Sequence, residues 1–461
     1  MDTEPEIRTT AGVVRGRWEN AVAVFRGIPY AEPPFGPLRF KAPVPAARWD
    51  GVRDAAEFGP PVPQPAHSSA DDCLTLNIWS PELAAAGLPV MVWIHGGTYL
   101  EGTSGNPHHD GATLASTGVV VVSMNYRTGF EGFAHIAGAP DNRGILDQAA
   151  ALRWVQENIA AFGGDPGNVT VFGQSAGAGC VAALLAMPMA VGLFRRAIPQ
   201  SMPGTYFSPR LAGAISAAIA ARVDARATVE ELSRIPPRAL INATDEILAD
   251  MPQRVDSWGP MALTPTPFSP VVDGDLLPCA PWRALSGGAA RDIDLLLGHT
   301  RDEYRLFATR LEGESAEAAQ MHEIANADWL FRMPCLHLAN AAHVGGGRVW
   351  VYELCWGFNR DEDASHSLDF LLVFGTLTAD DVRNHPAAYP NAADEAARLA
   401  RHMRADWVNF ATTGNPGWAR YDPGTRLTRV YTAEPSTQPY PEERSRRIWS
   451  EHYFDTLDLA T

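Results

Sequence analysis

Lysine is almost absent from this 461-residue sequence, and acidic residues outnumber basic ones. Lys41 is the only lysine, so arginines supply nearly all of the 37 basic side chains, against 53 aspartates and glutamates. The formal net charge at pH 7 is therefore −16. Because a nucleic-acid-binding surface needs clustered basic residues, this balance argues against nucleic acid as a partner.

Cysteine is also scarce. The five cysteines lie far apart at Cys73, Cys180, Cys279, Cys335 and Cys355. An odd, scattered set fits a reducing cytoplasm better than a disulfide framework. Since the sequence has no Cys-x-x-Cys motif and no close Cys/His spacing, we expect no metal site.

Long apolar runs are missing as well. No run reaches the roughly 18 residues of a membrane-spanning helix. Residues 1–6 have neither the basic nor the apolar part of a secretion signal. We therefore expect a cytoplasmic protein that does not contact membranes.

Short apolar segments alternate with helical patterns along most of the chain. The segments are continuous apolar runs, which is typical of strands covered on both faces in a mainly parallel sheet. We predict strands at residues 90–94, 119–124, 169–172, 295–297 and 349–352. With helical patterns over 145–162 and 176–187, the sequence predicts an α/β fold, a twisted central sheet flanked by helices.

Two Ala-rich helical stretches interrupt this series, approximately at residues 203–260 and 308–345. Strands on both sides of each stretch are needed to complete one sheet, so we interpret residues 1–461 as one domain. We expect the inserted helices to cover an active site.

A Gly-x-Ser-x-Gly motif lies where a strand-like run passes into a helical one, at Gly173-Gln174-Ser175-Ala176-Gly177. In such a strand–turn–helix the turn is so tight that the residues two positions from the serine must be small. The serine hydroxyl is then held clear of the backbone. The pattern predicts Ser175 as a nucleophile.

A serine nucleophile needs a base to take its proton, and in this type of turn the base follows it in the chain. Among the histidines after Ser175, His366 is favoured because it lies in a polar loop between the predicted strand 349–352 and an apolar run. His337 and His343 fall in a helical, Ala-rich stretch, where a structural role is favoured.

The base in turn needs an acid to orient it, expected after the predicted strand 295–297. Asp302 and Glu303 both lie there, and spacing alone does not choose between them. Either carboxylate could instead sit at the start of a helix, where acidic residues are common.

An oxyanion hole needs backbone N–H groups directed at the developing negative charge. The segment His95-Gly96-Gly97-Thr98 directly follows the predicted strand 90–94 and fits a loop that supplies such groups. A further N–H is expected from Ala176, next to the nucleophile. The alternative for the segment is a plain Gly-Gly turn.

Together these motifs resemble the type-B carboxylesterase family, which includes bacterial para-nitrobenzyl esterases and animal cholinesterases. The resemblance covers nearly the whole chain and implies the α/β-hydrolase fold. Besides the serine motif, the stretches that carry it are 25–34, 72–79, 125–127, 151–159, 407–411 and 414–416.

The resemblance implies specific roles. It makes Glu303 the catalytic acid, because the family's glutamate follows an aspartate in a Thr-x-Asp-Glu segment, and it makes His366 the base. Gly96 would shape the oxyanion loop. The N–H groups that it assigns to the oxyanion hole are those of Gly97, Thr98 and Ala176.

The sequence also departs from the family pattern. Where the family usually has glutamate before the serine, Gln174 removes a charge beside the triad. Thr98 stands where many members have glycine, and we expect its side chain to narrow the pocket. Cys73 matches a cysteine that closes a disulfide loop in secreted relatives, but Val62 occupies the partner position, so that disulfide cannot form.

The resemblance thus implies a serine carboxylesterase for small to medium uncharged esters that works through Ser175, His366, Glu303 and an acyl-enzyme, without metal or organic cofactor. The expected partner is a small-molecule ester, and nothing in the sequence indicates an oligomeric state. One alternative is an acyltransferase, or a lactone-forming or lactone-opening enzyme, with the same triad. A non-catalytic binding protein is disfavoured because the whole triad is present.

Overall fold

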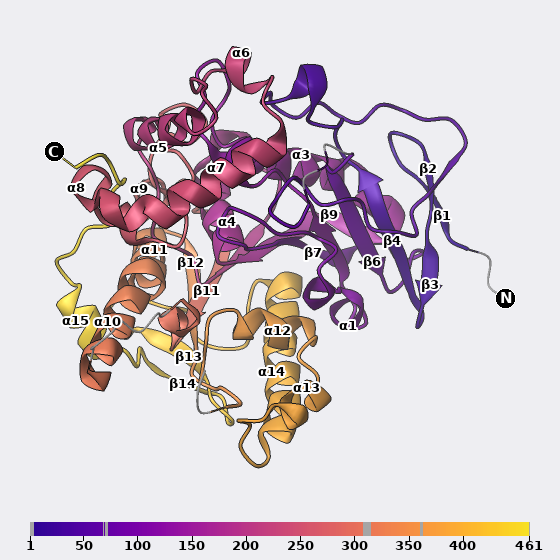
Figure 1. Cartoon of the computed structure of the whole chain (residues 1–461). Helices are drawn as coiled ribbons and strands as arrows, with labels where there is room; N and C mark the ends of the chain where they lie inside the picture. The colour runs from indigo at the N-terminus through magenta and orange to yellow at the C-terminus, as the bar shows by residue number, and fades with distance from the viewer. Residues whose placement is uncertain (1–3, 68, 70–71, 308–314, 360–362, 461) are drawn as a thin grey trace.

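A sheet of 11 strands runs through the molecule in the computed structural model, which describes residues 4–67, 69, 72–307, 315–359 and 363–460 (Figure 1). In spatial order its strands are β14 (Ser436–Pro439), β13 (Leu427–Tyr431), β12 (Arg348–Leu354), β11 (Asp294–Thr300), β10 (Arg196–Gln200), β9 (Gly164–Gln174), β7 (Leu88–Ile94), β8 (Val120–Met124), β6 (Thr75–Ser80), β4 (Val22–Pro29) and β3 (Arg17–Glu19). Neighbours from β13 to β8 are parallel, and the edges are antiparallel. A separate small sheet joins β1 (Glu6–Arg8), β2 (Val13–Arg15) and β5 (Val52–Asp54).

Strand side chains alternate between two apolar layers, one on each face of the sheet. On β7, Val90 and Val92 belong to one layer, whereas Met91 and Trp93 belong to the other. The first layer includes α3 (Arg143–Asn158) and α4 (Ala176–Ala186), and the second includes α12 (Leu368–Phe374) and α14 (Ala392–Thr413). The predicted α/β fold is confirmed, and the five predicted strands correspond to β7, β8, β9, β11 and β12.

The chain changes its direction of travel across the sheet at β7. It passes from β7 to β8 on one side, and then crosses through α3 to β9 on the other side. Open parallel sheets form ligand crevices outside the carboxyl ends of strands at such a switch point. The loops that follow β7 and β9 therefore lie where a site is expected.

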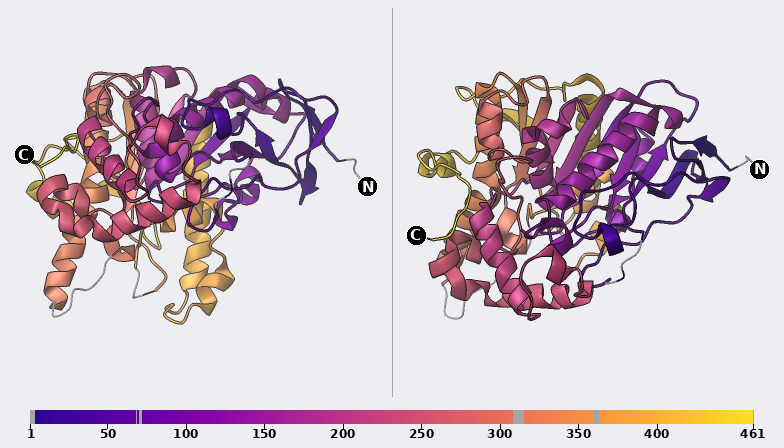
Figure 2. Two further views of the ribbon diagram at one scale, coloured as in Figure 1. Left: turned by 45° about the horizontal axis from the view of Figure 1, so that its top comes forward. Right: turned by 90° about the horizontal axis from the view of Figure 1, so that it is seen from above.

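Helices α5 (Pro209–Ala221), α6 (Val229–Leu232), α7 (Pro237–Asp250) and α8 (Val255–Trp258) fill the stretch 203–260 and gather at the upper left of Figure 1. The stretch 308–345 contains α10 (Ala316–Ala327), the π-helical turn η8 (Asp328–Arg332) and α11 (Met333–Val344), while its residues 308–314 lie outside the described part of the chain. Figure 2 shows the same elements from two further sides. Helix α11 packs against α9 (Pro281–Ser286), β11 and β12, so it is part of the layer on the sheet.

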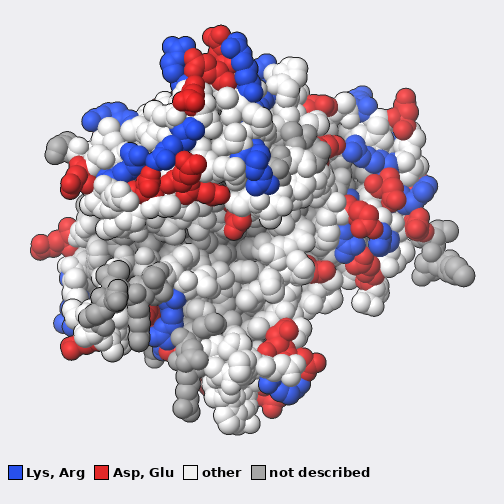
Figure 3. Space-filling model, in the orientation of Figure 1, with Lys and Arg blue, Asp and Glu red and all other residues white. Residues whose placement is uncertain are grey.

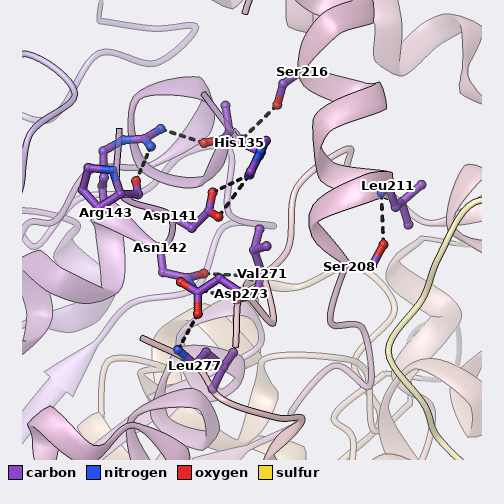
Figure 4. A network of polar contacts seen from close by, with 12 residues as sticks. His135, Asp141, Asn142, Arg143, Ser208, Leu211, Ser216, Val271, Asp273 and Leu277 are labelled. Carbon is purple, nitrogen blue, oxygen red and sulfur yellow. Dashed lines mark hydrogen bonds and ion pairs between the residues drawn. The ribbon is translucent and has the colours of Figure 1, made fainter. Parts of the chain in front are cut away.

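A polar network ties the α5 region to the start of α3 (Figure 4). The backbone N–H of His135 donates to Ser216 Oγ of α5 over 2.9 Å, and the His135 ring contacts Asp141. The Asn142 amide donates to the Val271 carbonyl and accepts from its N–H, at 2.8 and 2.7 Å. These contacts fix the segments around the inserted helices to the body of the sheet.

None of the helices in the described residues is both long and apolar enough to cross a membrane.

Candidate active site

Ser175 lies at the turn between β9 and α4, in the conformation expected of a nucleophile elbow. Its backbone angles, φ 57° and ψ −126°, lie in a region that residues other than glycine rarely adopt. A Cβ added to Gly173 would lie 2.7 Å from the Ile94 carbonyl oxygen, and one added to Gly177 would lie 2.1 Å from it. The predicted need for small residues on both sides of the serine is therefore confirmed.

His366 and Glu303 meet although they follow different strands. Glu303 opens the short helix η7 (Glu303–Leu306) after β11, and His366 lies between β12 and α12. The Nδ1 of His366 is hydrogen-bonded to Glu303 Oε2, and Glu303 Oε1 accepts the Thr300 N–H over 2.8 Å. Burial acts to raise the pKa of Glu303, but His366, together with Ser201 and His299, outweighs it and the pKa lies below its ordinary value. Glu303 is therefore a carboxylate beside the imidazole.

Asp302, the other acid that spacing allowed, is used elsewhere. Its carboxylate is 2.9 Å from the Arg301 guanidinium and accepts the Ala364 N–H over 3.1 Å. Those contacts hold the loop before His366. The structure brings Glu303, not Asp302, to the histidine.

Gln174 touches the second nitrogen of the same imidazole. Its amide N–H donates to His366 Nε2 over 2.9 Å, so Nε2 is the unprotonated nitrogen in this arrangement. Within the described part of the chain, the Ser175 hydroxyl makes no hydrogen bond. Sequence reasoning placed Gln174 beside the triad but missed this contact, because it depends on a side-chain rotamer.

The loop after β7 packs directly on the elbow. A Cβ added to Gly96 would lie 2.8 Å from the Gln174 carbonyl oxygen and 3.2 Å from Ser175 Cβ. Gly97 has a φ of 118°, and a Cβ there would lie 2.1 Å from the Glu101 carbonyl oxygen. Both glycines are thus required by space, which goes beyond what a plain Gly-Gly turn would need.

Thr98 and Ala176 complete the predicted set of N–H donors. Thr98 has a φ of 54°, and its hydroxyl donates to the Gly97 carbonyl over 2.7 Å. Ala176 is the first residue of α4, so its N–H lies among the free donors at the start of that helix. Gly97, Thr98 and Ala176 therefore all lie next to Ser175 or in the loop that packs on it.

A cavity opens beside Ser175 and measures about 350 Å³, counting the part open to solvent. Of the described residues that line it, none is charged. They are Thr98, Tyr99, Ser175, Ala176, Pro203, Thr205, Thr264, Pro265, Thr266, Phe307, Leu330 and Phe331. The rings of Phe307 and Phe331 lie 5.3 and 4.6 Å from the His366 ring, centroid to centroid. Figure 3 shows a hollow between the α7 and α12 regions in which few charged side chains are visible.

The competing histidines have structural positions. His337 packs against Trp282 and Phe454, as its helical setting predicted. His299 is buried, which lowers its pKa to about 4, and its Nε2 lies 3.0 Å from the Tyr440 hydroxyl. Neither is in contact with Ser175.

The cysteines form no disulfide, and the site's side chains do not form a metal-ligand group within the described residues. The five cysteines are free, and Cys73 and Val62 are both buried. Among the residues that the structure describes, no three His, Cys, Asp or Glu side chains group as metal ligands would.

Comparison with known proteins agrees with this geometry. A model of the carboxylesterase family matches residues 3–327. The para-nitrobenzyl esterase of Bacillus subtilis (strain 168) is 36% identical over 496 residues, covering 96% of this chain and 98% of that protein. Carboxylesterase 3 of Homo sapiens is 31% identical over 532 residues, covering 98% of this chain and 91% of that protein. The solved structure of a PNB esterase has a TM-score of 0.85 at 36% identity, covering 96% of this chain and 99% of that one.

Proposed function

We propose that Ser175, His366 and Glu303 carry out the hydrolysis of esters by this chain. The chain belongs to the carboxylesterase family and is a serine carboxylesterase. The observation that carries this proposal is the buried contact of His366 Nδ1 with Glu303. It leaves Nε2 as the basic nitrogen next to the elbow, which is the arrangement that a serine nucleophile needs.

The geometry supports a two-stage reaction. The Ser175 oxygen attacks the ester carbonyl carbon while its proton passes to His366 Nε2, and Glu303 stabilises the imidazolium that forms. The intermediate then expels the alcohol, which takes the proton from Nε2 and leaves an acyl-serine. Water, deprotonated by the same nitrogen, hydrolyses the acyl-serine and restores the hydroxyl. Gln174 must release or share Nε2 when Ser175 reacts.

Backbone N–H groups would bind the negative oxygen of each intermediate. Gly97, Thr98 and Ala176 are proposed as the donors, with Gly96 holding the loop against the elbow. Such donors are fixed before the reaction, so they stabilise charge without reorganising, and each is worth about 10²- to 10³-fold in rate.

We propose small to medium uncharged esters as the substrates. The described residues that line the cavity beside Ser175 present apolar and hydroxyl groups, and a charged acyl group would lose its hydration there without gaining a partner among them. Phe307 and Phe331 pack beside His366 and line the cavity, and we expect them to limit the length of acyl chain that fits.

Rates on p-nitrophenyl esters test the substrate class. For the wild-type protein, kcat/KM should be highest for an acyl chain of a few carbons, fall for longer chains, and be at least about tenfold lower for a hemisuccinate ester than for the uncharged ester of similar size. Equal rates on the charged ester would overturn the proposed substrate class.

Labelling by a fluorophosphonate probe tests the nucleophile. Ser175→Ala should lose both labelling and turnover, whereas Ser450→Ala, at an exposed serine, should keep both. Labelling that persists in Ser175→Ala would show that another residue is the nucleophile.

The chain has the α/β-hydrolase fold. We propose that residues 1–461 form one such domain with inserted helices at approximately 203–260 and 308–345. We also propose a cytoplasmic location, which the five free cysteines support because disulfides are rare in reducing compartments. Fractionation of the native host, with a periplasmic marker as reference, tests the location.

A further inference from the structure

A second cavity, lined mainly by charged and polar residues, lies at the other end of the strands from Ser175, where β10, β11 and β12 begin. The first residues of these strands, Arg196, Asp294 and Arg348, are register partners across adjacent strands. Ser175 and Glu303 follow the carboxyl ends of β9 and β11, so the length of the strands separates this cavity from the candidate active site. We call it the strand-start cavity, and its lining includes Arg195, Arg196, Asp294, Arg348, Trp350 and Arg420.

Positive charge in the strand-start cavity is not balanced. Among the described lining residues, four arginines accompany one carboxylate, that of Asp294, while Asp292 acts on Arg348 from outside the cavity. Asp294 is shared, because its Oδ1 accepts from Arg348 Nε and its Oδ2 lies 3.6 Å from Arg196 Nε. Within the described chain, the exposed side chains of Arg195 and Arg420 have no ion pair and no hydrogen bond.

Two buried N–H groups at this cavity have no hydrogen-bond partner among the described residues. The Arg196 side chain is only 5% exposed; its Nη1 donates to Asn168 Oδ1 and to the Ala411 carbonyl, and its Nε faces Asp294 Oδ2 at 3.6 Å, too far for a hydrogen bond. The indole N–H of Trp418, which also lines the cavity, is unpartnered too. Buried N–H groups are usually satisfied, so the Trp418 indole is a donor for which the described residues supply no acceptor.

The surroundings make this cluster unfavourable on its own. Burial lowers the pKa of Arg196, and the neighbouring Arg195 and Arg348 act in the same direction, although Asp294 opposes them. Like charges that converge in a cavity repel one another unless an anion neutralises them. The protein as a whole has a net charge of −16, so this cavity reverses the prevailing sign.

We propose that the strand-start cavity binds a small anion with two or more negative charges, of the phosphate or polycarboxylate class. Arginine suits this role because its planar guanidinium group can donate two parallel hydrogen bonds to such oxygens. The Arg420 guanidinium lies 5.5 Å from the centre of the Trp350 ring, which holds it in place before a ligand arrives. The site has no nucleophile of the Ser175 kind and is independent of the proposed hydrolysis.

Calorimetric titration of the full chain with pyrophosphate and with citrate tests the proposal. The titrations are made at low ionic strength, and sodium chloride of the same ionic strength serves as the blank. Binding of one anion per chain is expected for at least one probe, and the tighter probe identifies the phosphate or the carboxylate class. The double variant Arg195→Gln/Arg420→Gln should bind it about tenfold more weakly or worse, since each loses hydrogen bonds to a charged group. The control Arg153→Gln/Arg398→Gln removes the same charge at two exposed arginines outside the cavity and should bind within about twofold of the wild type.

A second variant tests the site without removing any arginine. Thr413 lines the cavity at the end of α14, and Thr413→Glu adds a carboxylate that should compete with the anion. All these variants should hydrolyse p-nitrophenyl acetate at the wild-type rate, so loss of anion binding is measured on an otherwise intact enzyme. Heats that the salt blank reproduces, equal weakening in the control pair, or unchanged affinity in Thr413→Glu would each overturn the proposal.

Discussion

Two histidine–carboxylate pairs in this protein are chemically alike but differ in their surroundings. In the pair of His366 and Glu303, the side chains are 3% and 0% exposed. In the pair of His135 and Asp141, they are 35% and 9% exposed. His135 Nδ1 lies 3.0 Å from both carboxylate oxygens, and this contact raises the pKa of His135 although burial opposes it (Figure 4). That pair is a half-exposed ion pair beside the helix α5.

The difference shows that what the second imidazole nitrogen faces decides what such a pair can do. At His366 it faces Gln174 and lies near the Ser175 elbow, beside a cavity whose described lining residues are uncharged. The ring is 3% exposed, so solvent screens its contact with Glu303 little. At His135 the ring remains partly in solvent, which screens the charge and leaves only a modest contribution to stability.

Replacing each histidine by glutamine gives the largest contrast. His366→Gln removes the base proposed for Ser175, and kcat on p-nitrophenyl butyrate should fall by at least about 10³-fold. His135→Gln should keep activity within about twofold. If His366→Gln retains a tenth of the wild-type kcat, or if both variants lose kcat equally, the assignment of His366 as the base is wrong.

The acids give the next contrast. Glu303→Gln keeps the shape of the side chain but removes the charge that stabilises the imidazolium, so kcat should fall by about 10³- to 10⁴-fold. Asp302→Asn is the matched control at the neighbouring position, where the carboxylate contacts Arg301 instead. Its activity should stay within about threefold, and the reverse order of effects in stopped-flow or steady-state rates would refute the assignment of the acid.

Local spacing made the central strands and the elbow predictable. Continuous apolar runs identified β7, β8, β9, β11 and β12, but not β10, because Arg196 and Pro199 interrupt its run. The burial of β10 comes from its neighbours β9 and β11, which no local pattern reports. The two glycines around Ser175 were predictable because the turn itself requires them.

Contacts between distant residues were less accessible from the sequence. His366 and Glu303 are 63 residues apart, and spacing left Asp302 open until the family resemblance favoured Glu303. The position of Phe331 over His366 depends on the π-helical turn η8, whose extra residue has no sequence signature. Side-chain placement across the cavity is set by packing, which a one-dimensional pattern does not contain.

Gln174→Glu gives the buried histidine His366 a second neighbouring carboxylate and so tests how charge at this position affects the base. A negative charge 2.9 Å from Nε2 would favour the imidazolium, and the base works only when unprotonated. The acidic limb of the kcat/KM profile should therefore move to higher pH, by about one pH unit. Gln174→Met, which fills similar volume without charge, serves as the control and should leave the limb within about 0.3 pH units of the wild type. An unmoved limb in Gln174→Glu would mean that this side chain does not act on the base.

The smallest effect is expected from the half-exposed pair, and it concerns stability. Because contact with Asp141 raises the pKa of His135 above that of the unfolded chain, its contribution is fully present below the unfolded histidine pKa of about 6.5 and is lost as pH rises through the higher folded value. His135→Gln should therefore lower the urea midpoint at pH 5.5 and have little effect at pH 9, with a cost of at most about 1 kcal/mol because solvent screens the pair. His343→Gln, at an exposed histidine, should show no such difference. Equal destabilisation by His135→Gln at both pH values would mean that the imidazole acts through packing, and the distinction between the two pairs would then rest on burial of the ring and not on its charge.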